Sequence, residues 1–346
     1  MGVIKPIAAE TALIDALDGA SGWLAQLREA TREQGLPSRR HEMWKWSDLR
    51  RAAAEISFAG TISVTGSLTG ADSAALEPAD GETVDLGIHA SAGAGAASLS
   101  LTVKSGRAVT LVERYSCDAG SLGNFHLDIK IEDGGRLERI CIQDEAEAGI
   151  MIASSRIDLA GNAKLTQIAL SFGGKLMRNE THVMHAGEHS EASLHGVYLL
   201  NEGRHNDYTT SVHHTGPGGI TRQLVKGAVA AHARGVFQGK FKVDRAAQLT
   251  DAKMTHRALM LDDRAEIDAK PELEIYADNV QCAHGNAIGT LDETALFYMR
   301  QRGIPLVQAR ALLIESYLAE PLDFVTDEAL REELRTALQQ RLRAIS

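Results

Sequence analysis

Cys282 and His284 are the two residues of this chain with the clearest potential for metal chemistry. They stand two positions apart in the segment QCAHG, which begins at Gln281. If this segment is a β-strand, the thiol and the imidazole project from the same face, because strand side chains alternate. Thiolate and imidazole groups bind soft and borderline metals, including the iron of clusters. Two ligands do not close a site, so another subunit would have to complete it; alternatively, Cys282 packs as a small apolar residue.

Histidines form a second group of candidate residues. None has the HExxH spacing of a zinc protease, and we expect most of them to be exposed or bonded to the backbone. A functional role stays open for His205 and for His213 or His214. The group is His182, His185, His189, His195, His205, His213 and His214.

The elements that must position these residues are predicted to be short strands. From about residue 60 to residue 280, apolar and polar residues alternate, as in SLSLTVKSG, FHLDIKIEDGG and ISVTGSLTG. Small turns precede several of these segments, and their glycines recur 28, 27 and 26 residues apart at 106, 134, 161 and 187. A period in the twenties indicates stacked coils. We expect glycine at these turns because it reaches positive φ without strain.

The predicted fold is therefore mainly β, a parallel, right-handed β-helix-like stack with a helical region at each end. A β-sandwich is the alternative, although its turns would come every 8–12 residues. Residues 1–60 form the predicted N-terminal helical region, 61–288 the β-helix core, and 289–346 the C-terminal helical region. The last region is also a candidate cap for the end of the stack, since an uncovered stack exposes unpaired strand edges.

Cys117 and Cys141 lie in predicted strands about one coil apart. They could stack on adjacent rungs, but buried, idle thiols are the expected outcome. In the N-terminal region, Trp44 and Trp46 stand near Arg39, Arg40 and Lys45. They could form a docking surface, although Trp44 is expected instead to pin its segment to the stack.

Composition narrows the functional classes. The formal net charge is −10 and no Lys/Arg run occurs, which argues against nucleic acid as the main partner. Three cysteines at wide spacing do not form a disulfide framework. No secretory signal or apolar run long enough to span a bilayer is visible, so a cytoplasmic protein without a membrane partner is expected.

The segment from Gly235 to Arg302 resembles the SufB/SufD family of iron–sulfur cluster assembly proteins. The matching elements fall in order at family spacing: GVFQGK, the step Asp251–Lys253, KPELEIYADNV, CAHG and ALFYMRQRGI. Weaker similarity covers LPSRRHEMWKWSDL and RHNDYTTSVHH. The CAHG motif is similar to SufD-type chains, whereas SufB-type chains read CEHEAT. Asn279 departs from the second Asp that many relatives carry.

The resemblance implies a scaffold without enzymatic activity that pairs with SufB and docks the ATPase SufC. It further implies that a transient iron–sulfur cluster forms at the shared interface, with His284 as a ligand and Cys282 as a second candidate. SufC would bind the C-terminal helices through Tyr298, Arg302, Leu312, Ile314, Tyr317 and Leu318. The chain itself carries no GxxxxGK[ST] motif for ATP. The resemblance does not decide whether a flavin joins the complex.

Two other functions are also consistent with the sequence. The chain could be a pure interaction subunit that stabilises its partner, or itself as a homodimer, without supplying a ligand. It could also be a carbohydrate-active β-helix enzyme, which would need clustered acids on one exposed face. Asp158, Asp207 and Asp244 are present, but the sequence gives no convincing cluster.

Overall fold

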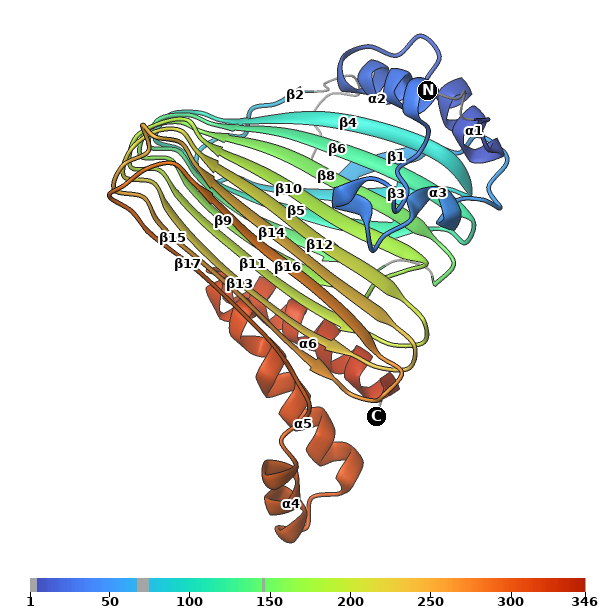
Figure 1. Cartoon of the computed structure of the whole chain (residues 1–346), viewed down its shortest axis with the longest axis vertical. Helices are drawn as coiled ribbons and strands as arrows, with labels where there is room; N and C mark the ends of the chain where they lie inside the picture. Colours follow the sequence, from blue (N-terminus) through green and yellow to red (C-terminus); the bar gives the residue numbers. More distant parts are fainter. Residues whose placement is uncertain (1–4, 67–74, 145–146, 346) are drawn as a thin grey trace.

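A computed structural model describes residues 5–66, 75–144 and 147–345, and its centre is a two-sheet parallel stack (Figure 1). Residues 67–70 of the predicted ISVTGSLTG strand lie outside these ranges. Odd-numbered strands form a 9-stranded sheet and even-numbered strands an 8-stranded sheet. Each coil of the chain thus gives one strand to each sheet, and about 8 turns follow one another. This confirms the mainly β, parallel stack with helices at both ends.

The strands have these bounds: β1 Ile62–Gly66, β2 Ala75–Leu76, β3 Thr83–Ala90, β4 Gly93–Val103, β5 Ala108–Cys117, β6 Ser121–Ile131, β7 Arg136–Gln143, β8 Ile150–Leu159, β9 Lys164–Ser171, β10 Leu176–His185, β11 Glu191–Leu200, β12 His205–His214, β13 Ile220–Val229, β14 Arg234–Val243, β15 Asp251–Met260, β16 Glu266–Ile275 and β17 Gln281–Gly289. Among them, β1 alone pairs antiparallel, with β3.

Alternation along each strand builds the interior of the stack. In β6, Phe125, Leu127, Ile129 and Ile131 all point inward and are buried. Burying each such side chain contributes about 1.5–3 kcal/mol. Both sheets supply residues to this one core, so the coils stack on their inner faces.

The turn glycines stack as predicted, but they do not all serve the same purpose. Gly106 and Gly134 have φ of +71° and +65°. At the next two coils the positive φ moves to Asn162 and His189, both at +55°. Gly187 is instead needed for close approach, since a Cβ there would lie 2.1 Å from the backbone nitrogen of Gly161.

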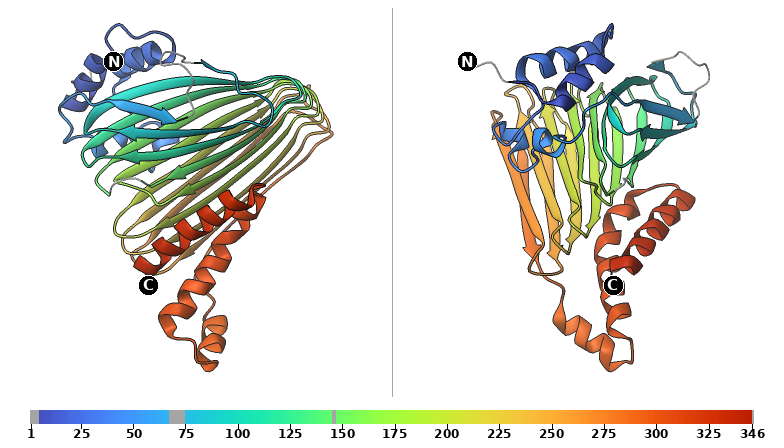
Figure 2. Two further views of the ribbon diagram at one scale, coloured as in Figure 1. Left: turned by 180° about the vertical axis from the view of Figure 1, so that it is seen from behind. Right: turned by 90° about the vertical axis from the view of Figure 1, so that its right-hand side faces the viewer.

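The N-terminal helices cover the outer face of the 8-stranded sheet (Figure 2). Helix α1 (Ala8–Ala16), α2 (Gly22–Gln34), the 3₁₀ turn η1 (Glu42–Trp44) and α3 (Leu49–Ala52) belong to this region. Leu13 and Leu49 are buried there against residues such as Leu122 and Ile152 of the sheet.

Residues 42–47, the N-terminal crossing segment, run across several strands of that sheet. Trp44 lies over the guanidinium of Arg178, with 4.1 Å between the Cζ atom and the ring centre. Arg178 also donates to the Met43 carbonyl at 3.0 Å and to Asp207 Oδ2 at 2.6 Å. Ser47 donates to the same Asp207 oxygen. Trp44 therefore pins its segment to the stack, as expected.

The C-terminal helices are α4 (Glu293–Gln301), α5 (Leu306–Ala319), the 3₁₀ helix η2 (Glu320–Phe324) and α6 (Glu328–Ile345). Helices α5, η2 and α6 pack on the 9-stranded sheet, whereas α4 packs on α5, and the end of the stack stays uncovered. Ile314, Leu318 and Leu338 pack against outward-facing residues of the sheet, including Ile168 and Val197. The predicted cap is therefore wrong, because the apolar faces of α5 and α6 match the sheet's outer face rather than the last coil.

Candidate functional site

The sequence pair Cys282 and His284 lies on β17, the last strand of the 9-stranded sheet. Cys282 pairs with Ala252 of β15, and His284 pairs with Met254. Ala252 and Met254 belong to the inner core. The thiol and the imidazole consequently stand on one face of β17, the face that continues the interior of the stack.

This face lies at an open end of the molecule. Strands β16 and β17 end the two sheets, and no further strand of the described chain pairs with them. Residues 283–289 of β17 are exposed, His284 among them, while Cys282 is half-buried. In the right-hand view of Figure 2, the orange strands form the outermost layer on their side. An unpaired strand edge is a template for another chain.

The two donor groups differ in electrostatic environment. Cys282 packs against Val243, Ala247 and Ala277, and this burial raises the pKa of its thiol. Since the thiolate is the metal-binding form, the isolated chain does not activate Cys282. His284 is exposed. Among the described residues, no three His, Cys, Asp or Glu side chains gather as a metal site, so the pair supplies two donors.

A polar chain leads inward from the same face of β17. Asn286 lies 2.7 Å from Nδ1 of His256, and Nε2 of His256 lies 2.8 Å from the Tyr198 hydroxyl. Burial lowers the pKa of His256 to about 4, so its ring is neutral at pH 7. The spacing of 282, 284 and 286 could have indicated a third polar residue on this face, but nothing in the sequence marked the buried partners.

The sequence pattern also does not indicate a buried ion pair that lies inside the stack. Arg139 of β7 donates to both carboxylate oxygens of Glu113 on β5, at 2.9 and 2.8 Å. It also donates to Ser155 at 2.7 Å and Gln167 at 2.8 Å. The pattern gave no signal because alternation does not tell an inward Arg from an outward one.

The other two cysteines do not face each other. Cys117 pairs with Ala90, whereas Cys141 pairs with Glu113 and Ala169. Both thiols are buried and outside any disulfide, and burial raises the pKa of Cys141. Stacking on adjacent rungs is therefore wrong. The expected burial of both thiols is confirmed, and Cys141 donates to Glu113 at 3.4 Å.

The histidines divide between the interior and the surface. Three of the seven, His185, His195 and His214, are buried, so the expectation of exposure fails for these three. His185 and His214 stack with ring centres 4.1 Å apart. At the surface, His213 lies 2.8 Å from Asp244. His205 lies 3.0 Å from Ser47 of the crossing segment, which gives it a structural role.

The residues predicted to bind a partner are partly exposed and partly buried. Tyr298 and Leu312 are exposed, and the guanidinium of Arg302 lies 4.6 Å from the Tyr298 ring centre. Ile314 and Leu318 are already buried against the sheet, and the ring of Tyr317 holds Lys226 at 4.5 Å. The exposed members lie on α4 and α5, which project from the stack (Figure 1).

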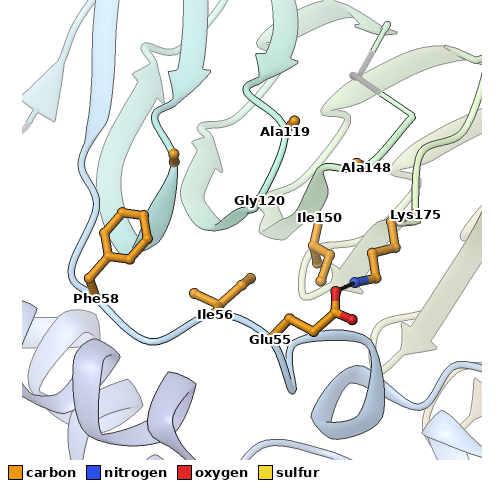
Figure 3. Close-up of a pocket in the computed structure, with 9 residues that line it drawn as sticks. Glu55, Ile56, Phe58, Ala119, Gly120, Ala148, Ile150 and Lys175 are labelled. Carbon is orange, nitrogen blue, oxygen red and sulfur yellow. Dashed lines mark hydrogen bonds and ion pairs between the residues drawn. The ribbon is translucent and has the colours of Figure 1, made fainter.

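A cavity beside the N-terminal region has no chemistry of its own. It measures about 270 Å³ and lies between the segment at Ile56 and the turns of the first coils (Figure 3). Phe58 and Ile150 line it, and Glu55 forms an ion pair with Lys175 at 3.1 Å. The lining holds no nucleophile or histidine, so this cavity is not a catalytic candidate.

The acids of the carbohydrate-enzyme alternative are engaged elsewhere. Asp207 is buried and paired with Arg178, while Asp158 lies 3.4 Å from Arg156. Asp207 therefore does not sit on an exposed face, as a glycosidase acid must.

In the described part of the chain, no helix is both long and apolar enough to cross a bilayer.

Comparison with known proteins identifies the family. The family model described as "SUF system FeS cluster assembly, SufBD core domain" matches residues 88–317. The chain is 30% identical over 244 residues to the iron–sulfur cluster assembly protein SufD of Escherichia coli, covering 70% of this chain and 58% of that protein. It is 33% identical over 211 residues to the chloroplastic protein ABCI7 of Arabidopsis thaliana, covering 60% and 44%.

These alignments span about half the length of the relatives. The family model, however, covers more than half of this chain and includes every strand from β4 to β17. The match extends through the CAHG segment on the open edge, where the sequence resemblance was most specific. The chain belongs to the SufBD family of SUF-system iron–sulfur cluster assembly proteins.

Proposed function

We propose that this chain is a non-enzymatic scaffold subunit of a cytoplasmic SUF assembly complex. It pairs with SufB through its open end and docks the ATPase SufC on its C-terminal helices. The nascent iron–sulfur cluster is the cargo, assembled at the interface with His284 as a ligand and Cys282 as a second donor.

The open edge of β17 is the observation that carries this proposal. It presents an exposed imidazole, a half-buried thiol and unpaired backbone groups on the last strand of the 9-stranded sheet. Exposed apolar side chains surround it, including Ile275, Tyr276 and Ile288. A partner strand would satisfy the backbone and cover these side chains. It would also bring the further ligands that a cluster needs.

The proposed SufC surface rests on α4 and α5. Phe297, Tyr298, Val307 and Leu312 are exposed there. Aromatic and aliphatic anchors on projecting helices are suited to a partner's groove.

Two matched substitutions separate these surfaces. Ile288 is 40% exposed and Leu312 is 41% exposed, so a Glu at either position adds the same charge at similar exposure. After co-expression with SufB and SufC, Ile288→Glu is expected to lose SufB and keep SufC bound directly to this chain. Leu312→Glu is expected to do the reverse. Affinity purification followed by mass spectrometry identifies the subunits that stay bound to each variant. Loss of the same partner from both variants would contradict the assignment of separate SufB and SufC surfaces.

His284→Ala tests the ligand role within an intact complex. We expect assembly to persist, because His284 is exposed and contributes little packing, while cluster absorbance falls several-fold. Asn286→Ala on the same face is the matched control and should retain the cluster. Unchanged absorbance in His284→Ala would remove the ligand role and leave the scaffold.

A pure interaction subunit is the second candidate, and the raised pKa of Cys282 favours it. In that case a second copy of this chain would use the same edge when SufB is missing. Light scattering of the purified chain measures this, since Ile288→Glu should then convert a dimer to a monomer.

A further inference from the structure

A basic cleft opens in the N-terminal region. It measures about 1300 Å³ and lies between the end of α2, the turn at residues 38–41 and α3. Its positive groups are Arg32, Arg39, Arg40, Arg50 and Arg51, against the acids Glu33 and Asp48. A chain with a formal charge of −10 thus gathers five arginines around one cleft.

Two of these arginines serve the fold. Arg50 binds the buried carboxylate of Glu10 at 2.8 Å, and Arg32 pairs with Glu29 at 3.0 Å. Asp48 is also engaged, since it caps α3 by accepting the backbone N–H of Arg51 at 3.0 Å. These contacts hold the walls of the cleft in place.

The remaining three arginines are free to bind a ligand. Over residues 5–66, 75–144 and 147–345, the side chains of Arg39, Arg40 and Arg51 make no hydrogen bond or ion pair. Like charges that line one cleft repel one another. A bound anion would relieve that repulsion.

The shape and lining of the cleft narrow the ligand class. Planar guanidinium groups bind phosphate oxygens in pairs, and three of them match two adjacent phosphates. Leu36, Ile7 and Ala54 add an apolar wall for an uncharged part of the ligand. The arginines line one cleft instead of forming a stripe, which favours a compact ligand over an extended polyanion.

We propose that this cleft binds the diphosphate group of a small ligand, either a nucleotide or free pyrophosphate. At about 1300 Å³ the cleft has room for a ligand of nucleotide size. The site is separate from the open edge of β17 and does not depend on the proposed cluster chemistry.

Calorimetric titration of the full chain tests the proposal with ADP, pyrophosphate and phosphate. We expect ADP or pyrophosphate to bind at least tenfold more tightly than phosphate. Tighter binding of ADP than of pyrophosphate identifies a nucleotide site, and equal binding identifies a diphosphate site. The variant Arg39→Gln/Arg51→Gln should weaken both at least tenfold without unfolding, because neither side chain bonds to the fold.

Arg136→Gln/Arg245→Gln is the control, since these exposed arginines lie outside the cleft and the variant has the same net charge. Its diphosphate affinity should match that of the wild type. The proposal is overturned if ADP and pyrophosphate fail to bind at millimolar concentration, if both double variants behave alike, or if hexaglutamate binds more tightly than ADP.

Discussion

Arg139→Ala is expected to lower the free energy of unfolding by about 3–5 kcal/mol, the usual effect of breaking a buried ion pair. Arg139 is 1% exposed, and its partner Glu113 is 0% exposed. Removing the guanidinium leaves the carboxylate charged inside the stack and takes a donor from Ser155 and Gln167. Urea unfolding followed by circular dichroism measures the loss.

Arg114, on the strand that carries Glu113, provides a matched control. It points outward and pairs with Glu333, and its side chain is 36% exposed. Arg114→Ala should cost less than about 1 kcal/mol, as exposed ion pairs do. The double variant Glu113→Leu/Arg139→Met should recover much of the loss, because it removes both charges and fills the space. Equal losses for Arg139→Ala and Arg114→Ala would contradict the buried-pair account.

Acid is expected to destabilise the fold steeply between pH 6.5 and about 4. Burial lowers the pKa of five histidines, to about 4 for four of them and well below its usual value for His185: His185, His195, His205, His214 and His256. In the unfolded chain each titrates near 6.5. Between these values the unfolded state binds protons that the folded state does not, so stability falls as the pH falls.

Each such histidine changes the free energy of unfolding by up to about 1.4 kcal/mol per pH unit in this range. Together the five histidines change it by several kcal/mol per pH unit. Carboxylates that stay ionised in their ion pairs add little to the pH dependence of stability between pH 6.5 and about 4. Burial opposes the ionisation of Glu180, but Arg178 and His182 lower its pKa to about 2. Melting temperatures measured at successive pH values give the slope.

His256→Asn isolates one member of the set. It should flatten the pH dependence of stability below pH 6.5, although it also costs stability at pH 7 through lost packing against Phe237. The exposed His232 is the control, and His232→Asn should leave the slope unchanged. Identical slopes in both variants would show that buried histidines do not cause the acid sensitivity.

Much of the candidate site could be predicted from local sequence. Alternation around Cys282 and His284 was enough to place both on one strand face, because the period of a strand is two residues. The helices followed from similar signals. Asp292 accepts N–H groups at the start of α4, and Pro305 precedes α5. At α6, Asp327 accepts the backbone N–H groups of Ala329 and Leu330.

The sequence by itself determined the stacked coils, the helical ends and the shared face of Cys282 and His284, since periodicity and capping act over a few residues. The tertiary structure alone decided that the C-terminal helices cover the 9-stranded sheet and leave β17 open. It also decided that Arg139 points inward while Arg114 points outward. Both faces of these strands are covered, so period-two alternation fits either orientation. The choice depends on partners such as Glu113 and Glu333, which lie 26 and 219 residues away.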